Sequence, residues 1–314
     1  MARHALRTLL FALLLAACAE GTGDAAPDAS DGPADAGFVD GGTGAGDAGR
    51  FDAGAVDAGG TDAGAADGGA GDAGLGPARV VVHYDVGFGR RITLRGSAAP
   101  LSWTAGYETT WTEGNQWVAT LDVAEPVELK PLIDDTKWAE GPNWKVAPGQ
   151  TVDVWPYFNH TAGAVTKWID WSNPSLGNTR PVWVYTPPSY SENAAQRYPV
   201  VYMHDGQNLF YDSMAFGGTS WNVQGAMDKG IADGTIREAL VIGVGNTSAR
   251  INEYTPVEDS RYAGSGKGDV YLQAVISDLK PKVDAAFRTQ AGPANTAIAG
   301  SSLGGLISSH AGNK

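Results

Sequence analysis

The distribution of apolar residues in this chain predicts two different folded regions. From residue 79, short runs rich in β-branched and aromatic residues are separated by turn residues such as Gly114-Asn115 and Pro148-Gly149. This spacing is typical of an antiparallel sandwich, so we predict a small all-β sandwich over residues 79–160. The expected strands are 80–84, 91–94, 117–121, 127–130 and 152–155.

After about residue 165 the pattern changes to strands that alternate with helices. Nearly continuous apolar runs at 182–185, 199–203, 239–244 and 296–299 predict strands, because strands buried on both faces are apolar throughout. One helix face is predicted from five apolar residues spaced four apart: Tyr271, Val275, Leu279, Val283 and Phe287. Residues 161–314 are therefore expected to form a largely parallel sheet covered on both sides by helices.

A third region, residues 19–78, has almost no apolar residues that could form a core. It consists mainly of Ala, Gly, Asp and Thr, and we predict a disordered linker. Six Asp residues recur every five positions from Asp47 to Asp72. A calcium-binding repeat is the alternative, but its fixed apolar position is missing, which favours a solvated tether.

The net charge of the chain is concentrated in that linker. The 314 residues carry a net charge of −13, of which residues 19–77 contribute −11. From Ala78 onward there are 19 basic and 23 acidic residues, so the folded part is close to neutral. The basic patches that a phosphate backbone requires are absent, and no nucleic-acid partner is expected.

The first 18 residues have the features of an export signal. Arg3 and Arg7 precede an apolar run at 9–15 that is too short to span a bilayer. The end of this run, Leu15-Ala16-Ala17-Cys18, resembles the lipobox of bacterial lipoproteins, whose Cys becomes the acylated first residue. Ordinary cleavage after the small residues Ala17-Cys18-Ala19 is the alternative. We predict an exported protein anchored to the bacterial cell envelope by lipid on Cys18, the only Cys in the chain.

A nucleophile motif stands at the last predicted strand. Gly300-Ser301-Ser302-Leu303-Gly304 fits the pattern G-x-S-x-G, directly after the apolar run 296–299 and directly before a helical run at 303–311. In that context the two glycines permit a strained turn that projects the serine hydroxyl above the edge of the sheet. Ser302 is therefore the candidate nucleophile.

Several further motifs resemble a family of α/β-hydrolases, the esterases related to esterase D, enterochelin esterases, feruloyl esterases and mycolyltransferases. They are the segments 182–188, 202–210, Glu253-Tyr254-Thr255-Pro256 and 300–306. The resemblance implies that the backbone amides of Gln207 and Leu303 form the oxyanion hole. A loop at 204–207 shaped only by packing is the alternative.

The catalytic triad of this fold is incomplete in the sequence. In the fold the acid and then the His follow the nucleophile, whereas no Asp or Glu and only His310 come after Ser302. His310 is eight residues along the expected helix, roughly 12 Å away, which is too far to bond Ser302. His204 is read mainly as a residue that shapes the oxyanion loop. We therefore expect an α/β hydrolase truncated after the nucleophile elbow.

The predicted sandwich resembles the starch-binding, family 20 type of carbohydrate-binding module. The segments 100–103, 128–130 and 138–143 carry the resemblance. It implies that Trp103 and Trp138 stack on sugar rings and that Lys130 and Asn143 hydrogen-bond hydroxyls. Ala139 replaces the acidic residue usual in that family. The alternative is that Trp103 and Trp138 are core residues, as we expect Trp117 and Trp155 to be. Trp111 and Trp144 could belong to either class.

Together these features predict a serine carboxylic ester hydrolase whose sandwich binds a polysaccharide or another glycan. No metal or organic cofactor is expected, because no group of His, Cys or carboxylate residues has ligand spacing. The alternative is a non-catalytic, surface-anchored carbohydrate-binding lipoprotein with a vestigial hydrolase half, which the incomplete triad favours.

Overall fold

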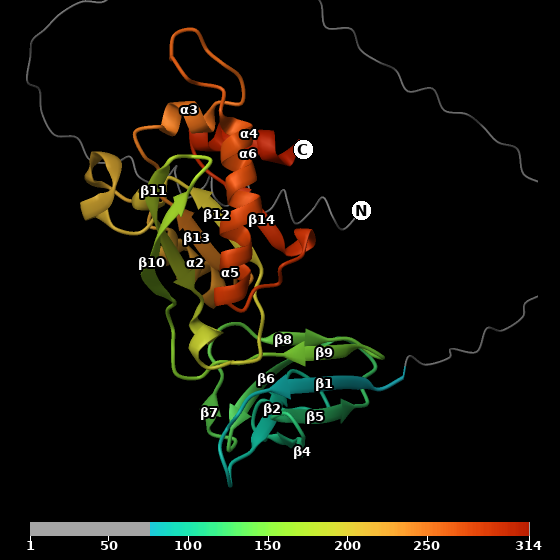
Figure 1. Ribbon diagram of the computed structural model, residues 1–314. Helices are drawn as coiled ribbons and strands as arrows, with labels where there is room; N and C mark the ends of the chain where they lie inside the picture. The colour runs from blue at the N-terminus through green and yellow to red at the C-terminus, as the bar shows by residue number, and fades with distance from the viewer. Residues whose placement is uncertain (1–75, 314) are drawn as a thin grey trace, which may run out of the picture. The chain divides into compact units, whose positions relative to one another are not determined.

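The computed structural model describes residues 76–313 (Figure 1). The predictions for the export signal, for Cys18 and for nearly all of the linker therefore lie outside the described residues. Within residues 76–313, no helix combines the length and the apolar character needed to cross a membrane.

Residues 78–158 form two sheets, here called the β unit. The first sheet has the order β4-β5-β1-β9, with β1 antiparallel to β5 and parallel to β9. Along β5 the buried Trp117, Ala119 and Leu121 alternate with more exposed residues, the period of two expected for a strand with one buried face. The strands of this sheet are β1 (Ala78–His83), β4 (Thr110–Thr112), β5 (Gln116–Leu121) and β9 (Thr151–Val154).

The second sheet of the β unit has the order β3-β2-β6-β7, and β8 also pairs with β6. Its Leu94 and Leu129 share one buried cluster with Val82 and Leu121 of the first sheet. Four strands of the unit, β3, β4, β7 and β8, were not predicted, because a strand of two or three residues shows no periodicity. The bounds are β2 (Ile92–Gly96), β3 (Tyr107–Glu108), β6 (Val127–Ile133), β7 (Lys137–Trp138) and β8 (Trp144–Val146).

The α/β unit, residues 164–313, contains a mixed sheet. Its order is β10-β11-β13-β12-β14. The pairings of β11 with β10 and with β13 are antiparallel, whereas β12 runs parallel to both β13 and β14. The prediction of a largely parallel sheet is thus wrong for two of the four pairings. The strands are β10 (Ala164–Asn173), β11 (Asn178–Thr186), β12 (Val200–His204), β13 (Leu240–Val244) and β14 (Thr296–Ala299).

The antiparallel pairing of β10 with β11 has a local cause. Only residues 174–177 connect β10 to β11, and so short a link joins antiparallel neighbours, whereas a parallel pair needs a crossover of a dozen residues or more. β10 was not predicted as a strand because it is only partly apolar. Its one fully buried large side chain is Trp171, while Lys167 and Asp170 face solvent.

Helices cover the two faces of the sheet through alternate strand residues. Val184, Tyr202 and Ile242 pack with α4, α5 and α6 on one face. Tyr185, Met203 and Val241 pack with α2 on the other. The helices are α2 (Val223–Ala232), α3 (Arg250–Tyr254), α4 (Gly268–Ala274), α5 (Lys280–Ala286) and α6 (Leu303–Gly312), all labelled in Figure 1. Short 3-10 turns are η1 (Pro188–Ser191), η2 (Gly206–Asn208), η3 (Asp212–Met214), η4 (Phe216–Gly218) and η6 (Pro293–Asn295).

The predicted apolar face at spacing four is present, but the helix that carries it is irregular. Tyr271, Val275, Leu279 and Val283 are all buried, and Phe287 lies just past the helix end. At 3.6 residues per turn, a spacing of four drifts by about 40° with each step. A π-helical turn, η5 (Val275–Leu279), joins α4 to α5, and its wider winding lessens that drift.

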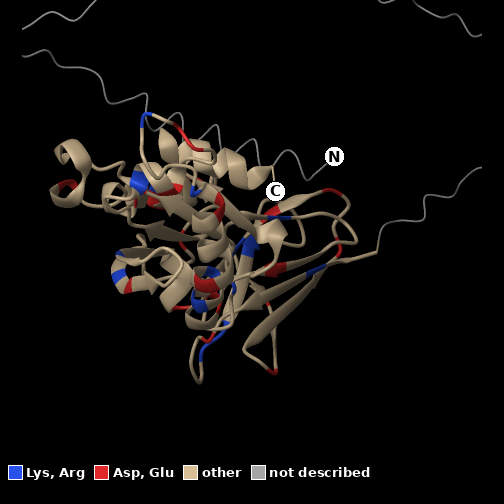
Figure 2. Ribbon diagram, turned by 45° about the horizontal axis from the view of Figure 1, so that its top comes forward, with Lys and Arg blue, Asp and Glu red and all other residues tan. Residues whose placement is uncertain are grey.

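Charged residues of both signs are interspersed along the described chain. Figure 2 shows basic and acidic positions on the β unit and on the α/β unit alike, in keeping with their nearly equal numbers after Ala78. Many of the exposed ones pair locally, as Lys167 does with Asp170.

Candidate functional site

Ser302 lies at a strained turn between β14 and α6. Its backbone has φ 55° and ψ −125°, a conformation that residues with a Cβ rarely adopt, and the residue is exposed. A Cβ on Gly300 would lie 2.7 Å from the carbonyl carbon of Gly304, so only glycine permits this close approach. The sequence Gly-x-Ser-x-Gly therefore folds here into the tight strand-to-helix turn expected from the motif.

A second unusual turn follows the neighbouring strand β12. Asp205 has left-handed backbone angles, φ 58° and ψ 46°, and η2 begins at the next residue. A Cβ on Gly206 would lie 2.6 Å from the backbone of Gly243 in β13, so glycine is required for this approach. Gln207 is thereby placed directly beyond the end of β12. We call residues 205–208 the 205–208 loop.

The sheet brings this loop and the Ser302 turn together. β12 and β14 are parallel neighbours, and Met203 pairs with Ala299, so both chains leave the sheet at the same edge. A Cβ on Gly304 would be 3.2 Å from the Cβ of His204 and 3.3 Å from Oδ2 of Asp205. The first turn of α6 therefore packs directly against the start of the loop that contains Gln207.

The amide of Leu303 is available for a ligand because of its place in α6. Leu303 is the first residue of that helix, and the first amides of a helix have no carbonyl partner within it. The positive end of the helix dipole lies at the same position. Leu303 and Gln207 thus lie on two adjacent elements, and each follows a strand at one edge of the sheet.

His204 is part of a buried aromatic cluster. Its Nδ1 lies 2.9 Å from the hydroxyl of Tyr271, and its ring packs 5.1 Å from that of Tyr254. Burial lowers the pKa of His204 to about 4, so the ring is neutral at physiological pH. His204 is 1% exposed, so its ring is engaged with Tyr271 and closed to solvent.

His310 also has a partner other than Ser302. Its Nε2 lies 2.7 Å from Oδ1 of Asp269, a residue of α4, and it sits in the last turn of α6. Ser302 precedes the first turn of the same helix. Their positions at opposite ends of α6 agree with the distance expected from the sequence.

Sequence reasoning missed three polar residues around the 205–208 loop. The carboxylate of Asp205 is 1% exposed and accepts hydrogen bonds from Nε and Nη2 of Arg250 at 2.7 and 2.8 Å. It also accepts one from Nδ2 of Asn246 at 2.6 Å. The only signal in the sequence was that Asn246 follows β13 and so lies at the same sheet edge.

The motif Glu253-Tyr254-Thr255-Pro256 supplies a second buried ion pair. Oε1 of Glu253 accepts hydrogen bonds from Nη2 of Arg180 and from Nδ2 of Asn178, both at 2.7 Å. The Arg180 guanidinium also lies over the rings of Trp171 and Tyr271. These contacts tie α3 to β11 and give the motif a structural role beneath the site.

Trp103 and Trp138 lie next to each other on the β unit. Their ring centroids are 6.2 Å apart with an angle of 35° between the planes, and they are 38% and 39% exposed. The guanidinium of Arg95 lies 5.2 Å from the Trp138 ring and bonds to Asp135, which holds that side of the pair in place. Neither ring belongs to the buried core of the unit.

The other residues predicted for this surface have intramolecular partners. Nζ of Lys130 donates to the carbonyl of Gly141 at 2.6 Å, and burial lowers its pKa. Nδ2 of Asn143 donates to Oε2 of Glu128 at 3.1 Å. Lys130 retains further donors, because an ammonium has three, and Asn143 retains its amide oxygen.

The remaining tryptophans of the β unit divide between core and surface. Trp117 is in the core, as expected, whereas Trp155 is only half-buried and stacks on His83 with centroids 4.0 Å apart. Trp144 packs against the core, and Trp111 is 54% exposed. The expectation of a core position is therefore wrong for Trp155, which lies one residue past the end of β9.

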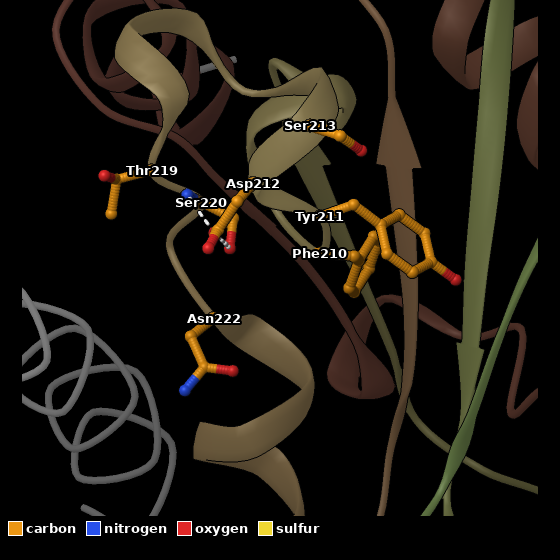
Figure 3. Close-up of a pocket in the computed structure, with 7 residues that line it drawn as sticks. All are labelled: Phe210, Tyr211, Asp212, Ser213, Thr219, Ser220 and Asn222. Carbon is orange, nitrogen blue, oxygen red and sulfur yellow. Dashed lines mark hydrogen bonds between the residues drawn. The ribbon is translucent and has the colours of Figure 1, made fainter.

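A hollow of about 620 Å³ follows the 205–208 loop along the chain (Figure 3). Phe210 and Tyr211 form one wall, and Asp212 accepts hydrogen bonds from the amide and hydroxyl of Ser220, both at 2.8 Å.

Among residues 76–313, no group of three or more His, Cys, Asp or Glu side chains could hold a metal ion.

Comparison with known proteins places this site in a family context. Residues 173–312 match the family described as "Putative esterase". An endo-1,4-beta-xylanase/feruloyl esterase of Xylanibacter ruminicola is 30% identical over 171 residues, which cover 51% of this chain and 21% of that protein. The uncharacterized protein YbbA of Bacillus subtilis is 28% identical over 142 residues, or 44% of this chain and 52% of YbbA. The chain thus spans about half or less of these relatives.

Among solved structures, an IroE-like serine hydrolase from Shewanella oneidensis is similar to part of the chain. The match has 23% identity and a TM-score of 0.35, and it covers 48% of this chain and 45% of the other. The Ser302 turn, the 205–208 loop and strands β11 to β14 all lie within residues 173–312. This is the segment that matches the family described as "Putative esterase".

Proposed function

We propose that this chain is the nucleophile-bearing part of a serine carboxylic ester hydrolase. The observation that carries the proposal is the backbone of Ser302, which is held at φ 55° by two close-packed glycines, exposed, and placed at the start of α6. Strain of this kind persists only where the surrounding structure enforces it, and it projects the hydroxyl away from the sheet.

In this reaction Oγ of Ser302 attacks the ester carbonyl carbon as its proton passes to a general base. The electron pair of the C=O bond moves to the oxygen, whose negative charge the amides of Gln207 and Leu303 stabilise. When this intermediate collapses, the bond to the alkoxide breaks, and the alkoxide takes up the proton held by the base. An acyl-enzyme remains. Water then attacks the acyl carbon by the same steps and releases the acid and Ser302.

The general base is the part of this mechanism for which neither His204 nor His310, the two histidines of the α/β unit, is placed. His204 is buried against Tyr271, and His310 pairs with Asp269 at the far end of α6. We propose that the base and its acidic partner lie outside the described residues. The rival function is a non-catalytic glycan-binding lipoprotein. It is supported by the same observation, that neither histidine is placed to act as the base.

We further propose that the β unit binds a glycan through Trp103 and Trp138, with Lys130 and Asn143 as hydrogen-bonding residues. Two adjacent, half-exposed indole rings offer the flat apolar surface on which sugar rings stack. A lipid anchor at Cys18 would hold the protein at the bacterial envelope, so that the esterase acts on carbohydrate-linked or other small esters there.

The test of the esterase proposal is hydrolysis of p-nitrophenyl acetate by the full-length gene product. Ser302→Ala should abolish the activity, and Ser309→Ala, an exposed serine on the same helix, should retain it. The 314-residue chain alone should turn over slowly, because neither His204 nor His310 is placed to accept the Ser302 proton. Robust hydrolysis by the full-length Ser302→Ala protein would contradict the proposal.

A further inference from the structure

Asp205 holds the 205–208 loop in an uncommon conformation. A left-handed backbone is disfavoured for any residue with a Cβ, and Asp205 adopts it one residue before Gly206. The direction in which the Gln207 peptide leaves the strand depends on this turn. Asp is among the residues that tolerate this conformation best, and contacts of its side chain can hold the turn in place.

The side chain of Asp205 is the group through which the surrounding structure holds the loop. A carboxylate that is almost fully buried is costly unless it is paired and hydrogen-bonded. The guanidinium of Arg250 meets both of its oxygens, the bidentate arrangement that also fixes orientation. Arg250 begins α3 and itself lies over the ring of Tyr254, which limits the positions open to it.

Asn246 holds the loop on both sides of Gly206. Its side chain donates to Asp205, and its backbone amide donates to Oε1 of Gln207 at 3.2 Å. Oδ2 of Asp205 in turn lies against the first turn of α6 at Gly304. One hydrogen-bonded group therefore links α3 and the end of β13 to both Gln207 and the Ser302 helix.

We propose that Arg250, together with Asn246, is a positioning residue that holds the Gln207 amide in the geometry required for the oxyanion hole. The inference rests on the proposed esterase function. Arg250 acts through Asp205 and does not touch the substrate. Losing the guanidinium leaves a buried carboxylate without its main partner, so Asp205 turns toward water and the peptide of Gln207 moves.

The experiment compares Arg250→Met with Arg250→Lys in the full-length gene product. Hydrolysis of p-nitrophenyl acetate by Arg250→Met should fall roughly 10- to 100-fold in kcat, with KM changed by about threefold or less, because small displacements of an oxyanion donor act on the transition state. Lysine keeps the charge but only one of the two hydrogen bonds, so part of the lost kcat should return.

The matched control is Arg261→Met. Arg261 also meets both oxygens of an aspartate, Asp259, but on the surface, and its loss should leave kcat unchanged. Hydrogen–deuterium exchange supplies a readout independent of activity. Residues 204–210 should exchange faster in Arg250→Met, whereas the rest of the α/β unit and the Arg261→Met protein should match the wild type.

Two outcomes of the exchange experiment would overturn the inference. One is unchanged exchange of residues 204–210 in Arg250→Met, and the other is faster exchange throughout the α/β unit, which would show a merely structural role. An unchanged kcat in Arg250→Met, with activity still dependent on Ser302, would also overturn it and leave the esterase proposal intact. If the wild type shows no Ser302-dependent hydrolysis, the esterase proposal fails, and the exchange data still decide whether Arg250 holds the loop.

Discussion

Gly300 and Gly304 meet so closely at the Ser302 turn that a Cβ on Gly300 would lie 2.7 Å from the carbonyl carbon of Gly304. Both sides of this contact are backbone, which cannot move aside as the end of a flexible side chain could. The strained backbone of Ser302 and the start of α6 both depend on this approach. The glycines of the motif are therefore steric requirements of the turn.

We predict that Gly300→Ala destabilises the protein by about 1–3 kcal/mol, because the extra methyl group forces the turn to open. Ester hydrolysis should be lost as Ser302 is displaced. Gly312→Ala is the matched control, since nothing lies within 4 Å of its added Cβ. Urea unfolding of both variants tests this, and equal stability of the two would contradict it.

A second prediction concerns acid stability and His204. Burial lowers the folded-state pKa to about 4, from the ordinary value of 6.5. Below pH 6.5 the unfolded chain therefore binds a proton that the folded protein does not, and stability is lost as the pH falls from 6.5 toward 4. This one group should cost on the order of 2 kcal/mol by pH 5.

The measurement is the free energy of unfolding at pH 7, 6 and 5 for wild type and His204→Asn. His204→Asn removes the titrating group and should show a shallower loss. Contributions from carboxylates are common to both proteins. Parallel curves for wild type and His204→Asn would show that the ring is not held neutral.

The third prediction concerns the aromatic pair. Trp103→Ala and Trp138→Ala should each weaken binding of a soluble α-glucan by about 1 kcal/mol, roughly fivefold in Kd, without unfolding the β unit. Trp117→Ala, by contrast, should destabilise the unit, because that ring lies in its core. Isothermal titration and thermal unfolding separate the two effects. Unfolding by both surface variants would identify those rings as structural.

The fourth prediction concerns Cys18. If the segment Leu15-Ala16-Ala17-Cys18 is a lipobox, Cys18→Ser removes the acylated residue and the protein should move from the membrane to the soluble fraction. Fractionation and the mass of the mature N-terminus measure this. An unacylated N-terminus in the wild type would exclude the anchor.

Local sequence was sufficient for the elements that place Ser302. Continuous apolar runs predicted β11 to β14 to within a few residues, and G-x-S-x-G identified the turn after β14 because its glycines and serine are contiguous. The spacing of four likewise identified the buried face from Tyr271 to Val283. In each case the residues that interact are close together in the sequence.

Features that depend on distant segments were decided by the tertiary structure alone. Three such features are the direction of β11 in the mixed sheet, the contact of Gly304 with Asp205, and the 6.2 Å separation of the Trp103 and Trp138 rings. Each depends on segments that are far apart in the sequence. The pairing of Asp205 with Arg250 spans 45 residues and has no periodic signal. The sequence pattern alone determined which strand ends carry polar and reactive side chains. Only the packing of the sheet decided which of those side chains meet, because the partner of a buried charge is set by the fold and not by its neighbours in the sequence.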